Sequence, residues 1–320
     1  MQLHGIHHVT AVTGNVGTNL DFYTHVLGLR LVKKTVNQDD VSAYHLFYAD
    51  KVGTPGTDIT FFDWPQTGAD RRGTDSIVTT MFRVNGHAAL EYWRSRFDEH
   101  NVKHGDIESV AGRELLRFED RENQRLALVD DGGLPFVAEP WDGAGVPLDF
   151  AIRGFYGITL SIPRLASLAP ILTEVLAFNE VERTTTNDNE MLVIYGMDGG
   201  GPGKEVHVIE QPGKAAAWLG AGGVHHVAFR VKDDEEQHEW RQRLAKVGLG
   251  VSPFIDRFYF HSIYFRISNG ILFEIATDGP GFTADEALDT LGEGLALPPF
   301  LEPHRAEIEA GLKPIPVLQS

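Results

Sequence analysis

The chain has 320 residues, of which 28 are lysine or arginine and 45 are aspartate or glutamate, so its formal net charge is −17. Such an acidic surface repels nucleic acid phosphates and anionic membranes, and we expect neither as a partner. The chain also lacks an apolar run long enough to span a membrane and a secretory signal, which predicts a cytoplasmic location. Because there is no cysteine, disulfides, thiolate nucleophiles and cysteine-based metal sites are excluded. A metal would need histidine and carboxylate ligands.

The first predicted unit occupies about the first 62 residues, and its opening strand carries Gly5-Ile6-His7-His8-Val9. Apolar residues with the spacing of one helix face, Leu20, Tyr23 and Leu27, predict a helix that ends at Gly28. Runs rich in β-branched and aromatic residues follow and predict three strands, at 29–32, 44–48 and 59–62. The unit therefore has the order strand, helix, three strands.

Three further units of the same order follow. The second and third open with predicted strands at 76–80 and 156–160, and each continues into a helical stretch, at 92–97 and 165–178. The fourth opens with Gly223-Val224-His225-His226-Val227, 218 positions after the first motif (223 − 5 = 218). A repeat of this length indicates a fold assembled from copies of one module.

In the fourth unit, the predicted helix carries Trp240, Leu244 and Val247 and ends at Gly248. Strands are predicted at 262–266 and 271–275, joined by a hairpin turn at Asn269-Gly270.

A polar, turn-rich stretch between the second and third modules contains Asp130-Asp131-Gly132-Gly133 and Pro140-Trp141-Asp142-Gly143. We therefore expect an α+β fold of four βαβββ modules paired into two domains, residues 1–150 and 151–320. The tail, from about residue 279 to residue 320, has a different composition and a predicted helix at 303–311. It is expected to be an arm packed on the body.

The two His-His pairs are the candidate metal ligands. Adjacent side chains on a strand point to opposite faces, so a regular strand lets only one histidine of each pair face a shared cleft. His225 shares its face with Val227, whereas His226 shares the more open face with Ala228, and the first module shows the same tendency. His8 and His226 are therefore the predicted ligands.

Glu274 lies in the middle of the otherwise core-like strand 271–275. A buried ionised carboxylate costs several kcal/mol unless a positive charge compensates it, and a divalent metal does so. Two histidines and one carboxylate leave positions open on an octahedral Fe(II), enough for a chelating substrate and dioxygen. Mn(II) and Zn(II) are the alternative ions. In the competing interpretation, the histidines bond to backbone groups and Glu274 pairs with Arg257 or Arg266.

Together these motifs resemble the vicinal oxygen chelate superfamily of glyoxalases and extradiol dioxygenases. The resemblance covers essentially the whole chain and is strongest to the hydroquinone-type ring-cleaving dioxygenases. It rests on both His-His motifs and on the following segments: Phe22-Tyr23, Val26-Leu27-Gly28-Leu29, Asp256-Arg257, Tyr264-Phe265-Arg266, Gly270-Ile271-Leu272-Phe273-Glu274-Ile275-Ala276-Thr277 and Pro280-Gly281-Phe282.

The resemblance implies cupped mixed sheets and an Fe(II)-dependent dioxygenase that incorporates both atoms of dioxygen into hydroquinones or related dihydroxylated aromatic compounds. It implies Fe(II) held by His8, His226 and Glu274, with five further catalytic residues around it: His7, Thr10, His225, Arg257 and Tyr264. The implied partners are the aromatic substrate and dioxygen, and a homo-oligomeric state is left open.

The resemblance assigns roles to three of these residues. His225 would accept and return a proton, Arg257 would stabilise negative charge on dioxygen or the substrate, and Tyr264 would bind the second ring hydroxyl. Their structural alternatives are a packed histidine, an ion pair with Asp256 or Glu274, and cross-strand packing. A flat strand would turn His7 and His225 away from the metal, unless strong twist or a bulge intervenes.

Two rival functions remain open at this point. A glyoxalase-like metal-dependent isomerase or lyase usually needs a second acidic ligand. In the first module the position that matches Glu274 falls within Thr60-Phe61-Phe62, which has no carboxylate, although Asp58 and Asp63 lie nearby. A metal-free binding module of the same fold is the other rival.

Overall fold

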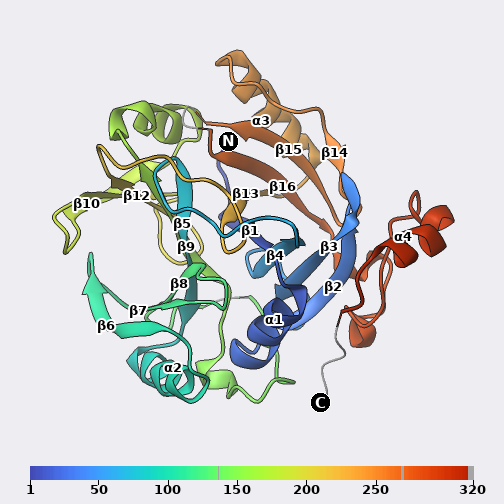
Figure 1. Ribbon diagram of the computed structural model, residues 1–320. Coiled ribbons are helices and arrows are strands. Elements are labelled where there is room, and N and C mark those ends of the chain that lie inside the picture. The colour runs from blue at the N-terminus through green and yellow to red at the C-terminus, as the bar shows by residue number, and fades with distance from the viewer. Residues whose placement is uncertain (136, 268–269, 316–320) are drawn as a thin grey trace.

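The computed structural model describes residues 1–135, 137–267 and 270–315. Its strands form two eight-stranded mixed sheets, each curled into a half-barrel, which lie next to each other (Figure 1). Each sheet contains two modules joined by one antiparallel strand pair, β1 with β13 in the first sheet and β5 with β9 in the second. The expected α+β fold of four βαβββ modules with cupped mixed sheets is confirmed.

The first module follows the predicted order. The helical segment begins at Asn15, whose side chain accepts a hydrogen bond from the Thr18 amide (3.1 Å), and ends before Gly28, which has a φ of 72°. Its elements are β1 (Ile6–Thr13), α1 (Val16–Asp21), the π-helical turn η1 (Phe22–Val26), β2 (Arg30–Asn37), β3 (Asp40–Ala49) and β4 (Asp58–Asp63).

In the second and third modules one prediction is corrected. The helix expected over 165–178 is two short turns, because Pro170 has no amide hydrogen to continue a regular helix. The second module comprises β5 (Ser76–Val84), α2 (His87–Glu99), β6 (His104–Val110), β7 (Arg113–Glu119) and β8 (Arg125–Asp130). The turn η2 (Leu148–Phe150) precedes the third, which comprises β9 (Phe155–Ile162), η3 (Leu165–Ser167), η4 (Ile171–Val175), β10 (Asn179–Thr185), β11 (Met191–Gly196) and β12 (Glu205–Glu210).

The fourth module repeats the first. Val247, expected on the buried helix face, is instead an exposed residue just after the helix (52%). Asn269 of the predicted hairpin lies outside the described residues, and Gly270 has a positive φ of 84°. The elements are β13 (Val224–Val231), α3 (Asp234–Lys246), β14 (Ile255–Asp256), β15 (Phe260–Arg266) and β16 (Leu272–Pro280).

The modules do not pair in chain order. The first sheet has the strand order β14-β15-β16-β13-β1-β4-β3-β2, which joins the fourth module to the first. The second has the order β10-β11-β12-β9-β5-β8-β7-β6, which joins the third module to the second. Each sheet therefore takes one module from either side of residue 150, and the division into domains at that residue remains a prediction.

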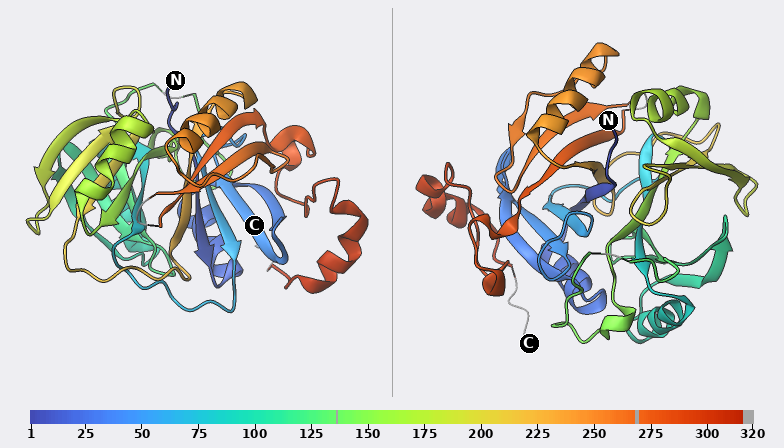
Figure 2. Two further views of the ribbon diagram at one scale, coloured as in Figure 1. Left: turned by 90° about the horizontal axis from the view of Figure 1, so that it is seen from above. Right: turned by 180° about the vertical axis from the view of Figure 1, so that it is seen from behind.

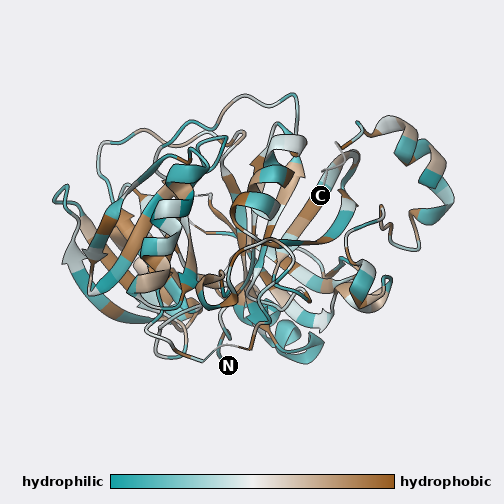
Figure 3. Ribbon diagram, turned by 90° about the horizontal axis from the view of Figure 1, so that it is seen from below, coloured by the Kyte–Doolittle hydropathy of each residue, from teal (hydrophilic) through white to brown (hydrophobic). Residues whose placement is uncertain are grey.

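One hydrophobic core contains residues of all four modules. Hydrogen bonds from two helices also link neighbouring modules. Arg96 of α2 donates to the Val26 carbonyl of η1 (2.8 Å), and Arg243 of α3 donates to the Glu174 carbonyl of η4 (2.7 Å). Apolar residues concentrate on the strands, and polar residues mark the outer helix surfaces (Figure 3). None of the helices in the described ranges has the length and apolarity needed to cross a membrane.

The tail forms the expected arm, which extends along the outside of β2 and β3 (Figure 2). Four turns and helices make it up: η5 (Phe282–Ala284), η6 (Leu288–Thr290), η7 (Glu302–His304) and α4 (Arg305–Gly311). Phe282 and Leu291 join a buried cluster with residues of β2, β3, β13 and β16. The arm therefore contributes to the core of the first half-barrel.

Candidate metal centre and substrate cavity

The site lies on the concave face of the first sheet, at the junction of its two modules. Val9 and Val227 join the hydrophobic core, whereas their neighbours His8 and His226 face the opposite side. The antiparallel pairing of β1 and β13 skips one residue on each strand, His7 in β1 and His225 in β13. The expected bulge is therefore present in both histidine motifs, and it keeps each outer histidine close to its neighbour.

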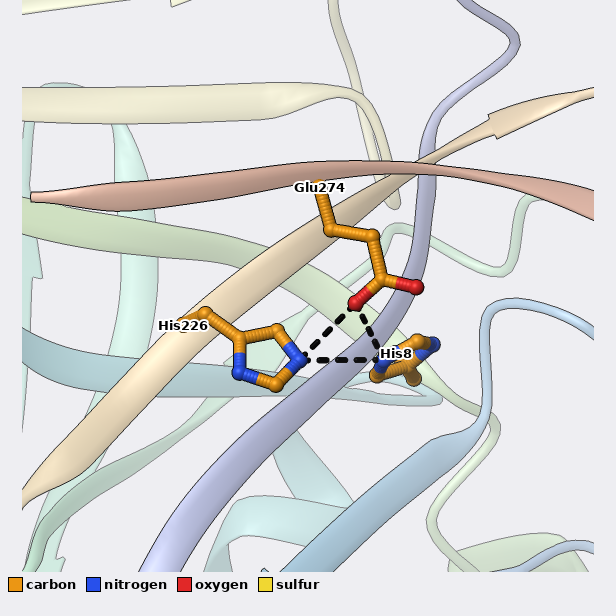
Figure 4. A group of neighbouring side chains, drawn as sticks. All are labelled: His8, His226 and Glu274. Carbon is orange, nitrogen blue, oxygen red and sulfur yellow. Dashed lines mark hydrogen bonds and ion pairs between the residues drawn. The ribbon is translucent and has the colours of Figure 1, made fainter. Parts of the chain in front are cut away.

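Three predicted ligands converge (Figure 4). Oε2 of Glu274 lies 2.9 Å from Nε2 of His226 and 3.2 Å from Nε2 of His8. The two Nε2 atoms are 3.4 Å apart, and all three side chains are buried. Within the described part of the chain, this is the one group of three such side chains whose donor atoms come this close.

The protonation of His8 follows from the atoms behind it. Nε2 of His7 lies 3.1 Å from the Thr277 carbonyl, which can only accept, so this nitrogen carries the hydrogen. Burial lowers the pKa of His7 well below its usual value, so the ring is neutral and its Nδ1 is an acceptor. Nδ1 of His8, 2.9 Å away, must therefore donate. In the neutral His8 ring the lone pair is then on Nε2, which faces Glu274.

This arrangement fits a bound cation. Oε2 of Glu274 is buried and forms no hydrogen bond with any described residue, although it faces the two imidazoles. Donor atoms that share an ion at about 2.1 Å lie about 3.0 Å apart at right angles and about 3.4 Å apart at tetrahedral angles. The three observed separations fall in or next to this range. The His8-His226-Glu274 group can therefore hold a metal ion, without the distances selecting which ion.

Burial and neighbouring side chains set the protonation states of Glu274, His226 and His225. Burial alone would raise the pKa of Glu274, but the adjacent His8 and His226 imidazoles hold it well below its usual value. Burial lowers the pKa of His226, and it lowers that of His225 to about 3. The carboxylate is therefore ionised and both histidines are neutral near neutral pH.

A cavity of about 350 Å³ opens beside the three ligands. Four of the five further residues predicted for the site line it: Thr10, His225, Arg257 and Tyr264. His7 is not among the lining residues and lies behind His8, with its ring 5.1 Å from that of Phe260. His7 is therefore placed to orient a ligand, whereas the other four can touch a molecule in the cavity.

Arg257 pairs with neither Asp256 nor Glu274. Its Nη2 donates to Asp39 (3.0 Å), and its Nε donates to the hydroxyl of Tyr264 (3.2 Å). Burial alone would lower the pKa of Arg257, but Tyr264 and Asp39 raise it, whereas burial and Glu274 raise that of Tyr264. Arg257 therefore presents a cationic guanidinium to the cavity, and Tyr264 presents a protonated phenol.

Sequence reasoning missed three residues of this site. Ser262 donates to Oε1 of Glu274 (2.5 Å), and Asp39 binds Arg257 from a turn 218 positions away. His45 lines the cavity between the rings of Phe47 and Phe62, and its Nε2 lies 2.9 Å from the hydroxyl of Thr60. No local motif marks these residues, although the alternation of β3 places His45 on the same face as Phe47.

The first module has no fourth ligand. Thr60 lies opposite Thr10 in the β1·β4 pairing, just as Glu274 lies opposite Ala228, the residue 218 positions after Thr10. Thr60 therefore occupies the counterpart of the Glu274 position, and its hydroxyl donates to Thr10 (2.8 Å). Neither Asp58 nor Asp63 belongs to the metal-ligand group.

Comparisons with known proteins identify the family. The model of the Glyoxalase/Bleomycin resistance protein/Dioxygenase superfamily matches residues 5–162. MhqA of Bacillus subtilis (strain 168), which bears the name of a ring-cleaving dioxygenase, is 46% identical over 315 residues, which cover 98% of this chain and 100% of MhqA. The chain belongs to this superfamily.

Further relatives place it among the dioxygenases of the superfamily. Chlorohydroquinone/hydroquinone 1,2-dioxygenase of Sphingobium indicum is 31% identical over 314 residues, which cover 96% of this chain and 95% of the relative. A crystal structure described as a dioxygenase of Bacillus subtilis matches with a TM-score of 0.90 and 39% identity, over 100% of this chain and 99% of that one. The resemblance to ring-cleaving dioxygenases is therefore confirmed.

Glyoxalase I from Zea mays matches with a TM-score of 0.63 over 86% of this chain and 92% of that one. At 12% identity, this likeness concerns the fold alone.

Proposed function

We propose that this dioxygenase uses Fe(II), bound by His8, His226 and Glu274, to cleave the aromatic ring of hydroquinones in an extradiol-type reaction. The observation that carries the proposal is the convergence of two buried imidazoles and one buried carboxylate beside a cavity lined by Arg257 and Tyr264. The hydroquinone substrate named for the Sphingobium indicum relative supports the substrate class.

The ligand set leaves the metal open to further ligands. Fe(II) held by two histidines and one carboxylate supplies binding positions for an ionised substrate hydroxyl and for dioxygen, and a path for electrons between them. Mn(II) would suit the same three donors, and Zn(II) would bind them without offering redox chemistry. A reaction with dioxygen therefore favours Fe(II).

The cavity residues would bind and orient the substrate. Arg257 provides a positive charge for an ionised ring hydroxyl or for negative charge that develops during the reaction. Tyr264 accepts a hydrogen bond from Arg257, so its own hydroxyl hydrogen is available to the second substrate hydroxyl. Thr10, held by the hydroxyl of Thr60, lies beside the ligands and offers a further hydrogen-bonding oxygen.

The hydrogen bond between the paired histidines refines the role of His225. When Nε2 of His226 binds a metal, its Nδ1 carries the hydrogen and donates to Nδ1 of His225, 2.7 Å away. A neutral His225 then has its hydrogen on Nε2. In this tautomer Nε2 would donate a hydrogen bond to a substrate oxygen, and it has no lone pair with which to accept a proton from the substrate.

An isomerase of the glyoxalase type has less support, because the fourth acidic ligand that this chemistry usually uses is replaced by Thr60. A metal-free binding module would not explain the buried Glu274 carboxylate between two imidazoles, because burying this charge without a cation costs free energy.

The test is oxygen uptake by protein reconstituted anaerobically with Fe(II), with hydroquinone, methylhydroquinone and catechol in parallel. We expect uptake with the hydroquinones, together with the absorption of a muconic semialdehyde product. Glu274→Gln should lose bound iron and uptake together, whereas His225→Ala should keep iron and turn over more slowly. Turnover of methylglyoxal with glutathione, with hydroquinone untouched, would instead favour the isomerase, and unchanged activity of Glu274→Gln would exclude that ligand.

A further inference from the structure

The second sheet has a cavity of its own. It lies on the concave face formed by the second and third modules and has a volume of about 510 Å³, compared with about 350 Å³ for the cavity beside the metal ligands. Both volumes lie in the range of small-molecule sites. Because the two sheets are built from repeats of one module, their cavities can be compared position by position.

The strand registers give the counterparts of the two ligand histidines. In the first sheet His8 pairs with Ala228 and Thr10 with His226, and in the second Thr79 pairs with Thr159 and Met81 with Gly157. In both sheets a residue is skipped immediately before this pairing begins on the first strand, His7 in β1 and Val78 in β5. Thr79 therefore replaces His8, and Gly157 replaces His226.

The counterpart of Glu274 is a histidine. Glu274 lies opposite Ala228 in the first sheet, and His207 lies opposite Thr159 in the second. Threonine, glycine and one histidine cannot supply the three ligands of the first sheet. The second sheet therefore has a cavity at the corresponding place, but it lacks the three side chains that could hold a metal.

Not every cationic side chain of the second cavity has an ion-pair partner among the described residues. Arg125, the half-buried first residue of β8, lines the cavity, and its guanidinium forms no hydrogen bond or ion pair with any described residue. Burial and the neighbouring Arg72 lower its pKa, and although Asp70 and Glu119 act in the opposite direction, the pKa stays below its usual value. An anion in direct contact would therefore stabilise the charged form. The exposed Lys214 stands on the same lining and is likewise unpaired within the described ranges.

Two of the acidic residues in the lining already have partners. Glu108 accepts a hydrogen bond from Arg117 (2.5 Å), and Glu190 accepts one from the amide of Gln211 (2.6 Å). The third, Asp188, is exposed in the turn between β10 and β11. Arg125 is therefore a partly desolvated charge of this lining whose guanidinium has no direct ion-pair partner among the described residues.

The rest of the lining suits a small organic molecule. Nε2 of the buried His207 is held by Glu205 (2.8 Å), and the hydroxyls of Thr79 and Thr159 form no hydrogen bond with described residues. The apolar side chains of the lining include Met81, Leu115, Leu192 and Ile209. The cavity thus combines an unpaired cation and free hydroxyl groups with an apolar surface.

We propose that the second cavity is a binding site for small carboxylates with an apolar body, with the carboxylate on Arg125 and the body against Met81 and Leu192. A charge-assisted bond from a partly desolvated guanidinium is about twice as strong as a neutral one, and it would orient the ligand. This site would work without a metal and independently of the catalytic cavity.

Methionine methyl signals give a readout specific to this cavity, because the chain has four methionines and Met81 is the one that lines it. Full-length protein with ¹³C-methyl methionine would be titrated with benzoate and, as the neutral probe, with benzyl alcohol. We expect a saturable shift of the Met81 signal, assigned with Met81→Leu, for benzoate. Benzyl alcohol should bind at least about tenfold more weakly, since it lacks the charge.

Arg125→Gln should raise the benzoate dissociation constant at least about tenfold, and Lys214→Gln, at the exposed rim, about twofold to threefold. The matched control is Arg183→Gln, an exposed arginine of the same sheet that pairs with Glu180 and should leave the affinity unchanged. The proposal is overturned if benzoate does not shift the Met81 signal, or if benzyl alcohol binds with equal affinity. It is also overturned if Arg125→Gln binds benzoate with unchanged affinity. In that variant, the signal of the buried Met197 at its native position shows that the protein is folded.

Discussion

At the scale of residues, each metal-facing atom is held by a second group behind it. The Thr277 carbonyl fixes the hydrogen on His7, which in turn fixes the hydrogen on His8. Ser262 does the same for Glu274 by donating to Oε1, so that Oε2 remains directed at the two imidazoles. Such outer contacts orient ligands and adjust their basicity, so their loss should affect metal binding before it affects folding.

Ser262→Ala is expected to weaken metal binding by about 10- to 100-fold, because Oε1 of Glu274 loses its donor and the carboxylate can rotate. The measurement is competition with a chelator of known affinity, using Mn(II) or Fe(II) under anaerobic conditions. Ser161→Ala is the matched control, since this strand serine of the second sheet donates to Gln211 and lies far from the ligands in sequence and sheet. Equal losses in both variants would indicate a general packing defect instead.

At the scale of elements, the turn between β2 and β3 closes the curled first sheet against its far edge. Gln38 donates to the backbone carbonyl of Arg257 (2.9 Å), and Asp39 accepts from its guanidinium. Since the strand order puts β2 and β14 at opposite edges, these two contacts join the ends of the half-barrel above the cavity. The turn therefore positions Arg257 without contacting the metal ligands.

Asp39→Asn should lower kcat/KM by at most about fivefold, the effect of one partly exposed ion pair, and leave metal content unchanged. The effect should appear mainly in KM if Arg257 binds the substrate anion in the ground state, and in kcat if it acts only in the transition state. Steady-state oxygen uptake separates the two. Asp40→Asn, in the same turn but bonded to Ser42, is the control, and a loss of activity there as large as in Asp39→Asn would argue against a specific contact.

At the scale of the whole molecule, the buried ammonium group of Lys33 links the arm to the first half-barrel. Lys33 of β2 is fully buried, forms ion pairs with Asp285 (2.7 Å) and Glu286 of the arm, and lies over the ring of Tyr259. Tyr259 itself donates to Asp285 (2.9 Å). This buried charge therefore adds to the apolar contacts of Phe282 and Leu291 in holding the arm on the body.

Lys33→Met should destabilise the protein by about 3 kcal/mol, because it leaves two poorly hydrated carboxylates without their partner. Denaturant unfolding measures the change. Adding Asp285→Asn and Glu286→Gln to Lys33→Met should recover much of the loss, since the unpaired charges are then removed. If the triple variant is no more stable than Lys33→Met alone, the lost free energy comes from packing and not from charge.

Much of the fold follows from local sequence patterns. Strand alternation and helical spacing are set by neighbouring residues, so they predicted the module order and the open faces of His8 and His226, and they narrowed the counterpart of Glu274 to residues 60–62. The prediction of one helix at 165–178 was wrong. The apolar spacing there is that of a helix, but Pro170 has no amide hydrogen and interrupts the helical hydrogen bonds.

The sequence by itself determined the repeated module and, through the resemblance that its motifs carry, the set of residues around the candidate centre. Only the tertiary structure decided that the first and fourth modules share a sheet, that bulges keep His7 and His225 beside the ligands, and that Ser262, Asp39 and His45 belong to the site. Sheet pairing and side-chain contacts join residues as much as 270 positions apart, so their energies depend on the assembled chain and leave no local pattern.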